Sequence, residues 1–288
     1  MKPKKTELAV LLIIPFSLFI LSFTVPLLYG LYLSLFGRRD DFVGLENYVR
    51  ALTDSRFWGS MAFTISYAAV TTVLMLVFGL LLAVSINRLN RGQGVLKTTI
   101  LIPWSISLTA WGLLASVVLS RNFGIANDLL LRIGIIESRV AWLSTVWPAR
   151  FSVVLSRFYK DVWFATLLFL VARQTISKEL YEQASISGAT SIQAFFYITI
   201  PLLLRNMLYI GTIVSIFALQ EFDMVYTLTA GGPAHATETV AVGIYRHGML
   251  FGNYRYGTAL ATTWSLFITI LVVSVFAPVQ LRMIRRKA

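Results

Sequence analysis

The stretch Glu182–Pro201, EQASISGATSIQAFFYITIP, lies between two long apolar runs and has the composition of two short helices rather than a flexible loop. Gly188 offers the permissive backbone that a sharp turn between helices requires. Thr190 and Gln193 have capping-box spacing, in which each side chain satisfies a backbone N–H of the other residue. Pro201 lacks an N–H and suits the first turn of the following helix. We therefore predict a helix–turn–helix here, although an ordinary amphipathic connector would show the same local features.

The composition around this stretch is that of a membrane protein. The chain has 288 residues, of which 57% are hydrophobic and only 13% are charged, and its mean hydropathy is +0.74. A soluble domain of this size carries about a quarter charged residues. Apolar runs of about 20 residues are typical of membrane helices. The chain is therefore predicted to be an all-α membrane protein with a single transmembrane domain over residues 1–288.

Six apolar runs are long enough to cross a membrane. The predicted spans are residues 8–36, 59–86, 98–119, 151–176, 202–228 and 258–279. The first run is too long for the core of a signal peptide and lacks a small-residue cleavage site, so it is assigned as a span. The helix–turn–helix occupies the loop 177–201 between the fourth and fifth spans.

Lys and Arg are distributed unevenly between the two sides of this topology. The side that holds both termini and the 177–201 loop carries 13 of the 25 basic residues and the other side 10, while Arg157 and Lys160 fall inside a span. Because basic loops favour the cytoplasm, both termini and the loop are predicted to be cytoplasmic.

Charge and cysteine content exclude several other classes. The formal net charge is +12, but no basic run is interleaved with exposed aromatic residues, so nucleic acid is not an expected partner. Basic loops that meet anionic membrane lipid explain the charge better. The chain has no cysteine, which excludes disulfides and thiolate metal sites. No glycine loop followed by Lys and Ser or Thr is present, so ATP binding by that motif is not expected.

Charged residues interrupt two of the predicted spans. Charges at membrane depth usually face a bundle interior or an aqueous cavity. Two interpretations remain open: a structural Arg157–Asp161 pair at i, i+4 near the membrane interface, or a solute pathway, in which case an anionic solute group becomes more plausible. The candidate pathway residues are Arg157, Lys160 and Asp161 in the fourth span and Gln220, Glu221 and Asp223 in the fifth.

The spacing in the loop resembles the cytoplasmic "EAA" motif of binding-protein-dependent ABC importer permeases. That motif is Glu-Ala-Ala, three residues, Gly, nine residues, then Ile-x-Leu-Pro. This chain keeps every spacing and departs at Gln183, in the second motif position, and at Ile200, in place of the Leu. Neither departure changes the helical register, so the same docking role is expected.

Two further segments are similar to sugar-uptake permeases of this family. The first precedes the second span, and the second follows the charged residues of the fifth. They comprise Gly44, Leu45, Asn47, Tyr48, Asp54, Phe57 and Trp58, and then Phe222, Asp223, Leu228, Thr229, Gly231, Gly232, Pro233, Thr237, Glu238, Thr239, Tyr245 and Gly257. With the loop, the resemblance covers most of the chain.

The resemblance implies a multi-pass permease of a bacterial or archaeal cytoplasmic membrane that works by alternating access. It implies a second related permease, two ABC ATPase subunits and an extracytoplasmic solute-binding protein as partners. It implies no cofactor on this chain, with ATP and Mg²⁺ bound by the ATPase subunits. The residues implied to couple ATP hydrolysis to transport are Glu182, Ala184, Gly188, Ala189 and Thr190.

Two other functions are compatible with a polytopic chain. A stand-alone secondary transporter or channel would use Asp161, Glu221 and Asp223 as ion sites, but it has no need of a structured cytoplasmic loop. A membrane-embedded enzyme usually needs clustered carboxylates or histidines. The two histidines here, His235 and His247, share one polar segment and are far apart in sequence.

Overall fold

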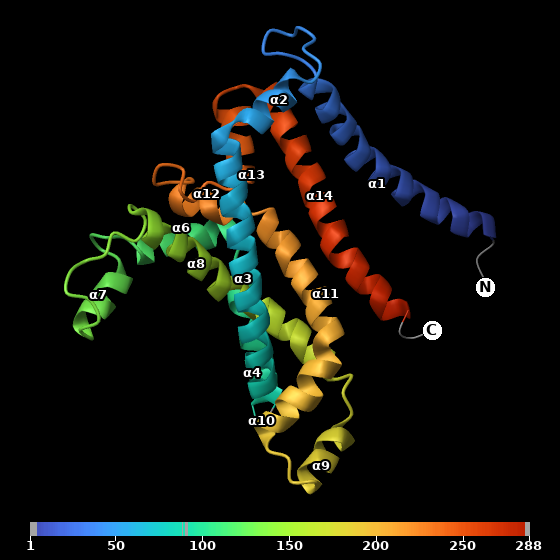
Figure 1. Ribbon diagram of the computed structural model, residues 1–288, viewed down its shortest axis with the longest axis vertical. Helices are drawn as coiled ribbons and strands as arrows, with labels where there is room; N and C mark the ends of the chain where they lie inside the picture. The colour runs from blue at the N-terminus through green and yellow to red at the C-terminus, as the bar shows by residue number, and fades with distance from the viewer. Residues whose placement is uncertain (1–4, 88, 90–91, 286–288) are drawn as a thin grey trace. The chain divides into compact units, whose positions relative to one another are not determined.

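The computed structural model describes residues 5–87, 89 and 92–285 and shows an all-helical chain (Figure 1). Six basic residues of the charge count lie outside the described residues, namely Lys2, Lys4, Arg88, Arg91, Arg286 and Lys287. Within the described part, regular structure consists of helices and one isolated bridge between Phe36 and Phe42. The predicted all-α class is confirmed.

Among the residues that the structure describes, four helical stretches are long and apolar enough to cross a membrane: Pro15–Ser34, Ser55–Asn87, Ser191–Leu219 and Tyr254–Ser274. A bent pair, Gly94–Ser105 and Leu108–Val118, would provide a fifth. The long helix α8 (Val146–Arg173) is outside this set, and it carries the charges of the predicted fourth span. The count of six crossings stays a prediction.

The chain divides into two compact units. The first unit comprises residues 1–58 and 243–288, and the second unit comprises residues 59–242. The organisation as one permease domain also stays a prediction.

The first unit is built on the packing of α14 (Tyr254–Arg285) against α1 (Lys5–Ser34), α2 (Glu46–Thr53) and the π-helical segment η2 (Arg246–Leu250) (Figure 1). The Asn47 side chain closes the end of α1, because its amide donates to the carbonyl oxygens of Ser34 at 2.9 Å and Phe36 at 2.8 Å. Tyr256 of α14 donates to the Asp54 carboxylate at 3.3 Å. Asn47 and Asp54 of the first family-like segment therefore hold helix ends together.

The second unit contains most of the remaining helices, and α13 (Val240–Tyr245) includes the boundary between the units. The elements of the second unit are α3 (Ser55–Asn87), whose residues 55–58 belong to the first unit, α4 (Gln93–Thr99), α5 (Leu101–Ser105), α6 (Leu108–Val118), α7 (Ile125–Arg132), α8, α9 (Lys178–Ile186), α10 (Ser191–Ala194), η1 (Phe195–Thr199), α11 (Ile200–Leu219) and α12 (Asp223–Thr229).

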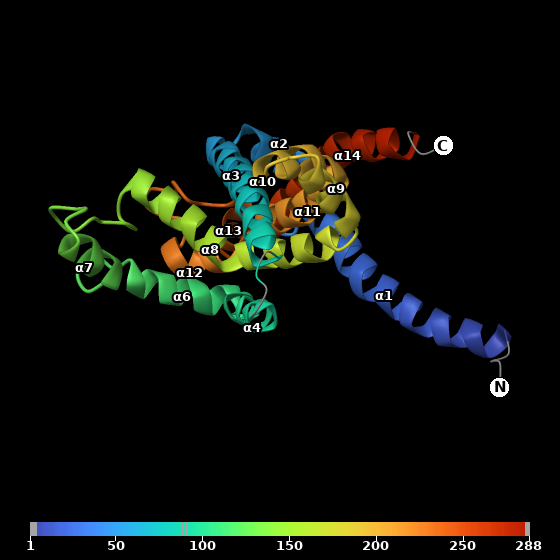
Figure 2. The same cartoon turned by 90° about the horizontal axis from the view of Figure 1, so that it is seen from below.

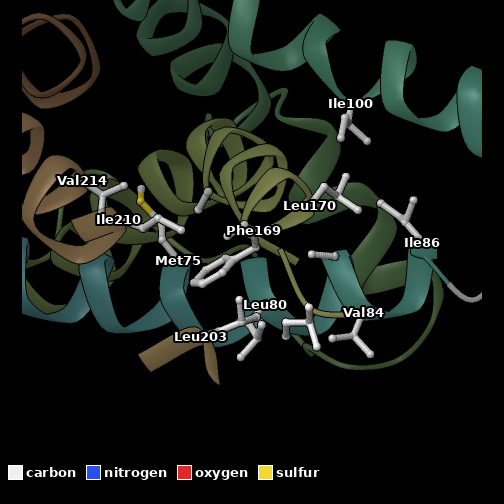
Figure 3. Packing of buried hydrophobic residues seen from close by; sticks show 14 residues of the cluster. Met75, Leu80, Val84, Ile86, Ile100, Phe169, Leu170, Leu203, Ile210 and Val214 are labelled. Carbon is white, nitrogen blue, oxygen red and sulfur yellow. The ribbon is translucent and has the colours of Figure 1, made fainter. Parts of the chain in front are cut away.

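The core of the second unit lies where α3, α8 and α11 meet (Figure 3). Phe169 of α8 and Leu203 of α11 are fully buried there, beside Met75 and Leu80 of α3. Within a bilayer such packing stabilises through van der Waals contact rather than through exclusion of water. These three long helices form the base on which the loop 177–201 is mounted.

The predicted third span is not one straight helix. Its segments Gly94–Ser105 and Leu108–Val118 meet at a bend of 87°. Ser107 lies at the bend with extended backbone, and its Oγ accepts the N–H of Ala110 at 3.2 Å. A side-chain cap of this kind satisfies a backbone N–H in the first turn of a helix, so a new helix can begin at this residue.

The predicted fifth span is also divided. Helix α11 ends at Leu219, and the chain turns before α12 begins at Asp223. Helix α12 packs on α6 and touches α8 (Figures 1 and 2). The segment that follows α11 is therefore a short helix folded onto neighbouring helices rather than the end of a straight span.

The close approach of α6 and α12 depends on Gly112. A Cβ at this position would collide with the Thr227 hydroxyl and lie 3.0 Å from the Met224 carbonyl oxygen. Gly59 of α3 is a contrasting helical glycine, because a Cβ added there would have no atom within 4 Å.

We expect Gly112→Ala to lower the stability of the protein by about 1–3 kcal/mol, the usual cost of overpacking. Gly59→Ala should leave stability unchanged or raise it, since alanine favours a helix by about 1 kcal/mol over glycine. The midpoint of thermal unfolding in detergent measures both. Equal midpoints for the two variants would contradict the tight α6–α12 contact.

Candidate functional site

The turn after α9 has the hydrogen bonds of a Schellman motif. The N–H of Ala189 donates to the Ala184 carbonyl oxygen at 2.9 Å, and the N–H of Gly188 donates to that of Ser185 at 3.0 Å. Gly188 has φ of +80°, a left-handed conformation that glycine adopts without strain. The predicted role of Gly188 as the turn residue is confirmed. Gly188 thus has a geometric reason to stand at its place in the motif, whereas Ala184 and Ala189 contribute to the turn through their backbone atoms.

The capping box at the next helix is also confirmed. The N–H of Thr190 donates to Gln193 Oε1 at 2.7 Å, and the N–H of Gln193 donates to Thr190 Oγ1 at 3.3 Å. Both ends of the turn are therefore closed by hydrogen bonds within the loop. The loop has a defined shape without any contribution from a partner.

One face of the loop is open to solvent. Glu182 and Gln183 are exposed, and in the described residues the Glu182 side chain forms no ion pair or hydrogen bond. Ile186, at the end of α9, is 87% exposed and Ile192 of α10 is 71% exposed. This face of the loop therefore presents both acidic and apolar side chains to solvent.

The other face of the loop is anchored. Phe195, Ile198 and Ile200 are partly buried and pack against the core of the second unit. Ile200 stands where the family motif has Leu, and its contact with the core shows that another aliphatic side chain fills this place. The loop thus combines a fixed base with an exposed face.

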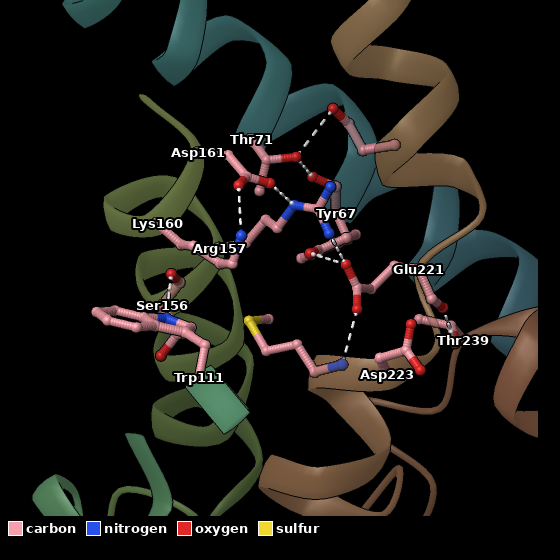
Figure 4. Close-up of polar contacts among 12 residues, drawn as sticks. Tyr67, Thr71, Trp111, Ser156, Arg157, Lys160, Asp161, Glu221, Asp223 and Thr239 are labelled. Carbon is pink, nitrogen blue, oxygen red and sulfur yellow. Dashed lines mark hydrogen bonds and ion pairs between the residues drawn. The ribbon is translucent and has the colours of Figure 1, made fainter. Parts of the chain in front are cut away.

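Four charged residues of the two predicted spans, Arg157, Lys160, Asp161 and Glu221, form one buried cluster (Figure 4). Arg157 Nε lies 2.7 Å from Asp161 Oδ2, and Arg157 also forms an ion pair with Glu221. Lys160 Nζ lies 3.2 Å from Asp161 Oδ1. None of these four residues is more than 8% exposed. With two cations and two carboxylates, the cluster is neutral as a whole.

Glu221 holds the turn between α11 and α12. Its Oε1 accepts the N–H of Met224, in the first turn of α12, at 3.0 Å, and its Oε2 accepts from the Tyr67 hydroxyl at 3.4 Å. Its backbone oxygen accepts from Thr239 Oγ1 at 2.8 Å (Figure 4). One buried residue therefore joins α3, α8, α12 and the segment before α13.

Gln220 and Asp223, the other two candidate pathway residues, are exposed on either side of the buried Glu221. Neither joins the ion-pair cluster. The structure thus brings four of the six candidates together. It leaves Gln220 and Asp223 exposed at the break between α11 and α12.

Sequence reasoning did not identify Tyr67, or Glu238, a buried carboxylate outside the cluster, as polar centres. Tyr67 lies in an apolar run that gives no signal of a charged neighbour. Glu238 is 1% exposed, accepts from Ser60 Oγ at 3.3 Å and lies 3.1 Å from His235 Nδ1. Across the described ranges, no group of three or more His, Cys, Asp or Glu side chains is placed to hold a metal ion.

Comparison with known families gives one match that covers most of the chain. Residues 75–288 match the family described as binding-protein-dependent transport system inner membrane component.

Curated relatives are similar over nearly the full length. The chain is 34% identical to the trehalose/maltose transport system permease protein MalF of Thermococcus litoralis, over 98% of this chain and 95% of the relative. It is 34% identical to the sulfoquinovosyl glycerol transport system permease protein SmoG of Agrobacterium fabrum, over 97% and 91%.

The fold is shared with a solved transporter. A chain of a bacterial alginate ABC transporter, in complex with an alginate pentasaccharide-bound periplasmic protein, superposes with a TM-score of 0.81 at 22% identity, covering 92% of this chain and 91% of that one. Together, the family match and the relatives show that the chain belongs to the binding-protein-dependent transport system inner membrane components, the multi-pass permease subunits of ABC importers.

Proposed function

We propose that this permease serves an ATP-driven importer of a sugar or sugar-derived solute. Its partners are a second related permease, two ATPase subunits and an extracytoplasmic solute-binding protein. The names of the relatives, which include maltose, lactose and glycerol-phosphate permeases, support the solute class. The observation that carries the coupling role is the helix–turn–helix of residues 178–194, with an exposed Glu182 on an anchored base.

Permease components of this family are non-catalytic and bind no cofactor themselves. Nucleotide use belongs to the ATPase partners. In the proposed assembly the chain converts a movement of those partners into a movement of its spans.

The proposed coupling element is the loop of Glu182, Ala184, Gly188, Ala189 and Thr190. A short helix with both ends closed by hydrogen bonds moves as a unit, whereas a flexible loop would absorb the displacement of a partner. The exposed Glu182 and Ile186 supply a charge and an apolar contact for the ATPase surface. This role places the loop and both termini in the cytoplasm, as the basic-residue distribution also favours.

The buried cluster of Arg157, Lys160, Asp161 and Glu221 forms, in this proposal, the wall of the solute pathway. Its charges compensate one another, so it offers no net charge to attract an anionic solute. Gln220 and Asp223 face the solute from the broken helix. An amide and a carboxylate suit the hydroxyl groups of a neutral sugar or polyol, since both accept hydrogen bonds and the amide also donates.

A stand-alone ion-coupled carrier is less well supported. Asp161 and Glu221 are both paired with Arg157, whose charge competes with any cation for these carboxylates. A carrier would also leave the exposed, structured loop without a function.

Purification of the tagged chain coexpressed with an ATPase, a second permease and a binding protein tests the proposal. The ATPase should copurify, and in lipid vesicles the loaded binding protein should stimulate hydrolysis.

Glu182→Lys should reduce solute uptake per ATP hydrolysed by about tenfold or more, because the reversed charge disrupts docking. Glu137→Lys, the same charge change at an exposed site between α7 and α8, is the control and should retain coupling. Recovery of the chain alone, or normal coupling in Glu182→Lys, would contradict the proposal.

A second prediction concerns the buried cluster. Arg157→Met leaves Glu221 buried without its ion-pair partner and should destabilise the protein by about 3–5 kcal/mol. Arg157→Met combined with Glu221→Gln restores neutrality, retains the Lys160–Asp161 pair and should recover most of the unfolding midpoint.

Transport by this double variant shows whether the buried cluster only lines the solute pathway or binds the solute. If the cluster is a wall, the double variant should import solute in vesicles with near wild-type affinity. A stable double variant that no longer transports would show that the Arg157 guanidinium or the Glu221 carboxylate acts on the solute, contrary to the proposal.

A further inference from the structure

Helix α9 is attached to the rest of the second unit in an unusual way. It contains no buried residue and packs broadly against none of the long helices. Its partly buried residues are Tyr181, the residue before Glu182, and Ala184, and of these two Tyr181 is the one that packs against the core cluster. The orientation of α9 therefore depends on what Tyr181 contacts.

Tyr181 bonds to the beginning of the following span. Its hydroxyl lies 2.9 Å from Thr199 Oγ1, and Thr199 is 1% exposed in the π-helical segment η1. Because η1 continues directly into α11, this hydrogen bond links α9 to a long helix of the core. It spans the whole turn of the loop, so it joins the two arms of the helix–turn–helix.

Tyr181 also contacts the end of the preceding span. The Arg173 guanidinium carbon, in the last turn of α8, lies 5.3 Å from the centre of the Tyr181 ring, within cation–π distance. Arg173 Nη1 donates in turn to the Val84 carbonyl oxygen of α3 at 3.4 Å. One side chain of α9 is thus connected to α8, α11 and, through Arg173, α3.

Cavities flank this connection. One of about 230 Å³ lies toward Thr190, Phe195 and Thr199, and another of about 600 Å³ lies toward Lys178 and Glu182. Arg173 and Tyr181 line both cavities. The Arg173–Tyr181 contact therefore lies between two open spaces.

From this geometry we propose that Tyr181 is a positioning residue for energy coupling. Its hydroxyl bond to Thr199 and its ring contact with Arg173 fix the direction of α9, so that a displacement at Glu182 moves α8 and α11 together. The inference rests on the proposed coupling role of the loop. The inference identifies Tyr181 as the residue that passes a displacement of α9 on to α8 and α11.

Tyr181→Phe tests the proposal with little risk to folding. The ring and its contact with Arg173 remain, and the Thr199 hydroxyl keeps a contact with the Ala194 carbonyl oxygen at 3.5 Å. In the reconstituted complex with loaded binding protein, ATP hydrolysed per solute imported should rise about 2- to 10-fold, the factor that one hydrogen bond is worth. The unfolding midpoint and the recovery of ATPase subunits should not change.

Two matched variants sharpen the test. Thr199→Val removes the same hydrogen bond from its other end. The double variant Tyr181→Phe with Thr199→Val should therefore hydrolyse no more ATP per solute imported than either single variant. Tyr197→Phe is the control, because this tyrosine belongs to the same loop but is 80% exposed, and it should leave the ratio unchanged.

The outcomes separate this inference from the proposed function. Loss of coupling in Glu182→Lys with a normal ratio in Tyr181→Phe would overturn the positioning role alone. Normal coupling in both would overturn the coupling role of the loop and this inference with it. A lower midpoint or poorer ATPase recovery at an unchanged ratio would show that the Tyr181–Thr199 bond serves only stability.

Discussion

Helix ends and charges within a membrane must be satisfied by the protein itself, since lipid offers no hydrogen bonds. In the second unit Glu221 meets both demands at the break between α11 and α12. Its carboxylate pairs with Arg157 and accepts the N–H of Met224. The break is therefore stable only because the guanidinium of Arg157, in α8, lies beside the Glu221 carboxylate. The folding of α12 onto α6 follows from that arrangement.

The same requirement shapes the loop at the other end of α11. The turn at Gly188 and the cap at Thr190 satisfy backbone groups from within the loop. This leaves the outer face, with Glu182 and Ile186, free for another protein. Permease subunits of this family are non-catalytic, and in the proposed function this chain passes on the movement of its ATPase partners. A rigid loop joined to three long helices through Tyr181 and Arg173 suits that task.

The sequence predicted the local features whose cause is local. The Gly188 turn, the capping box and the helical class follow from neighbouring residues, and the motif spacing indicated the family correctly. The breaks at Ser107 and after Leu219 were not predicted, because apolar residues resume beyond each break and each run was therefore assigned as one continuous span. Pairing of Arg157 with Asp161 was foreseeable from i, i+4 spacing. Its pairing with Glu221, 64 residues away, was not. Tyr181 carried no signal of its own, since its partners lie on either side of a loop.

The central claim is that the loop moves as one body with the core of the second unit. The chain has no cysteine, so spin labels at Ile186→Cys and Val171→Cys, both exposed positions, would be the only two on this subunit. Their distance distribution is measured by pulsed electron spin resonance in the full complex, without nucleotide and with ATP trapped. The account predicts one narrow distribution with the same mean in both states. A broad distribution, or a mean that shifts with nucleotide, would show that α9 moves independently of α8 and would contradict the account.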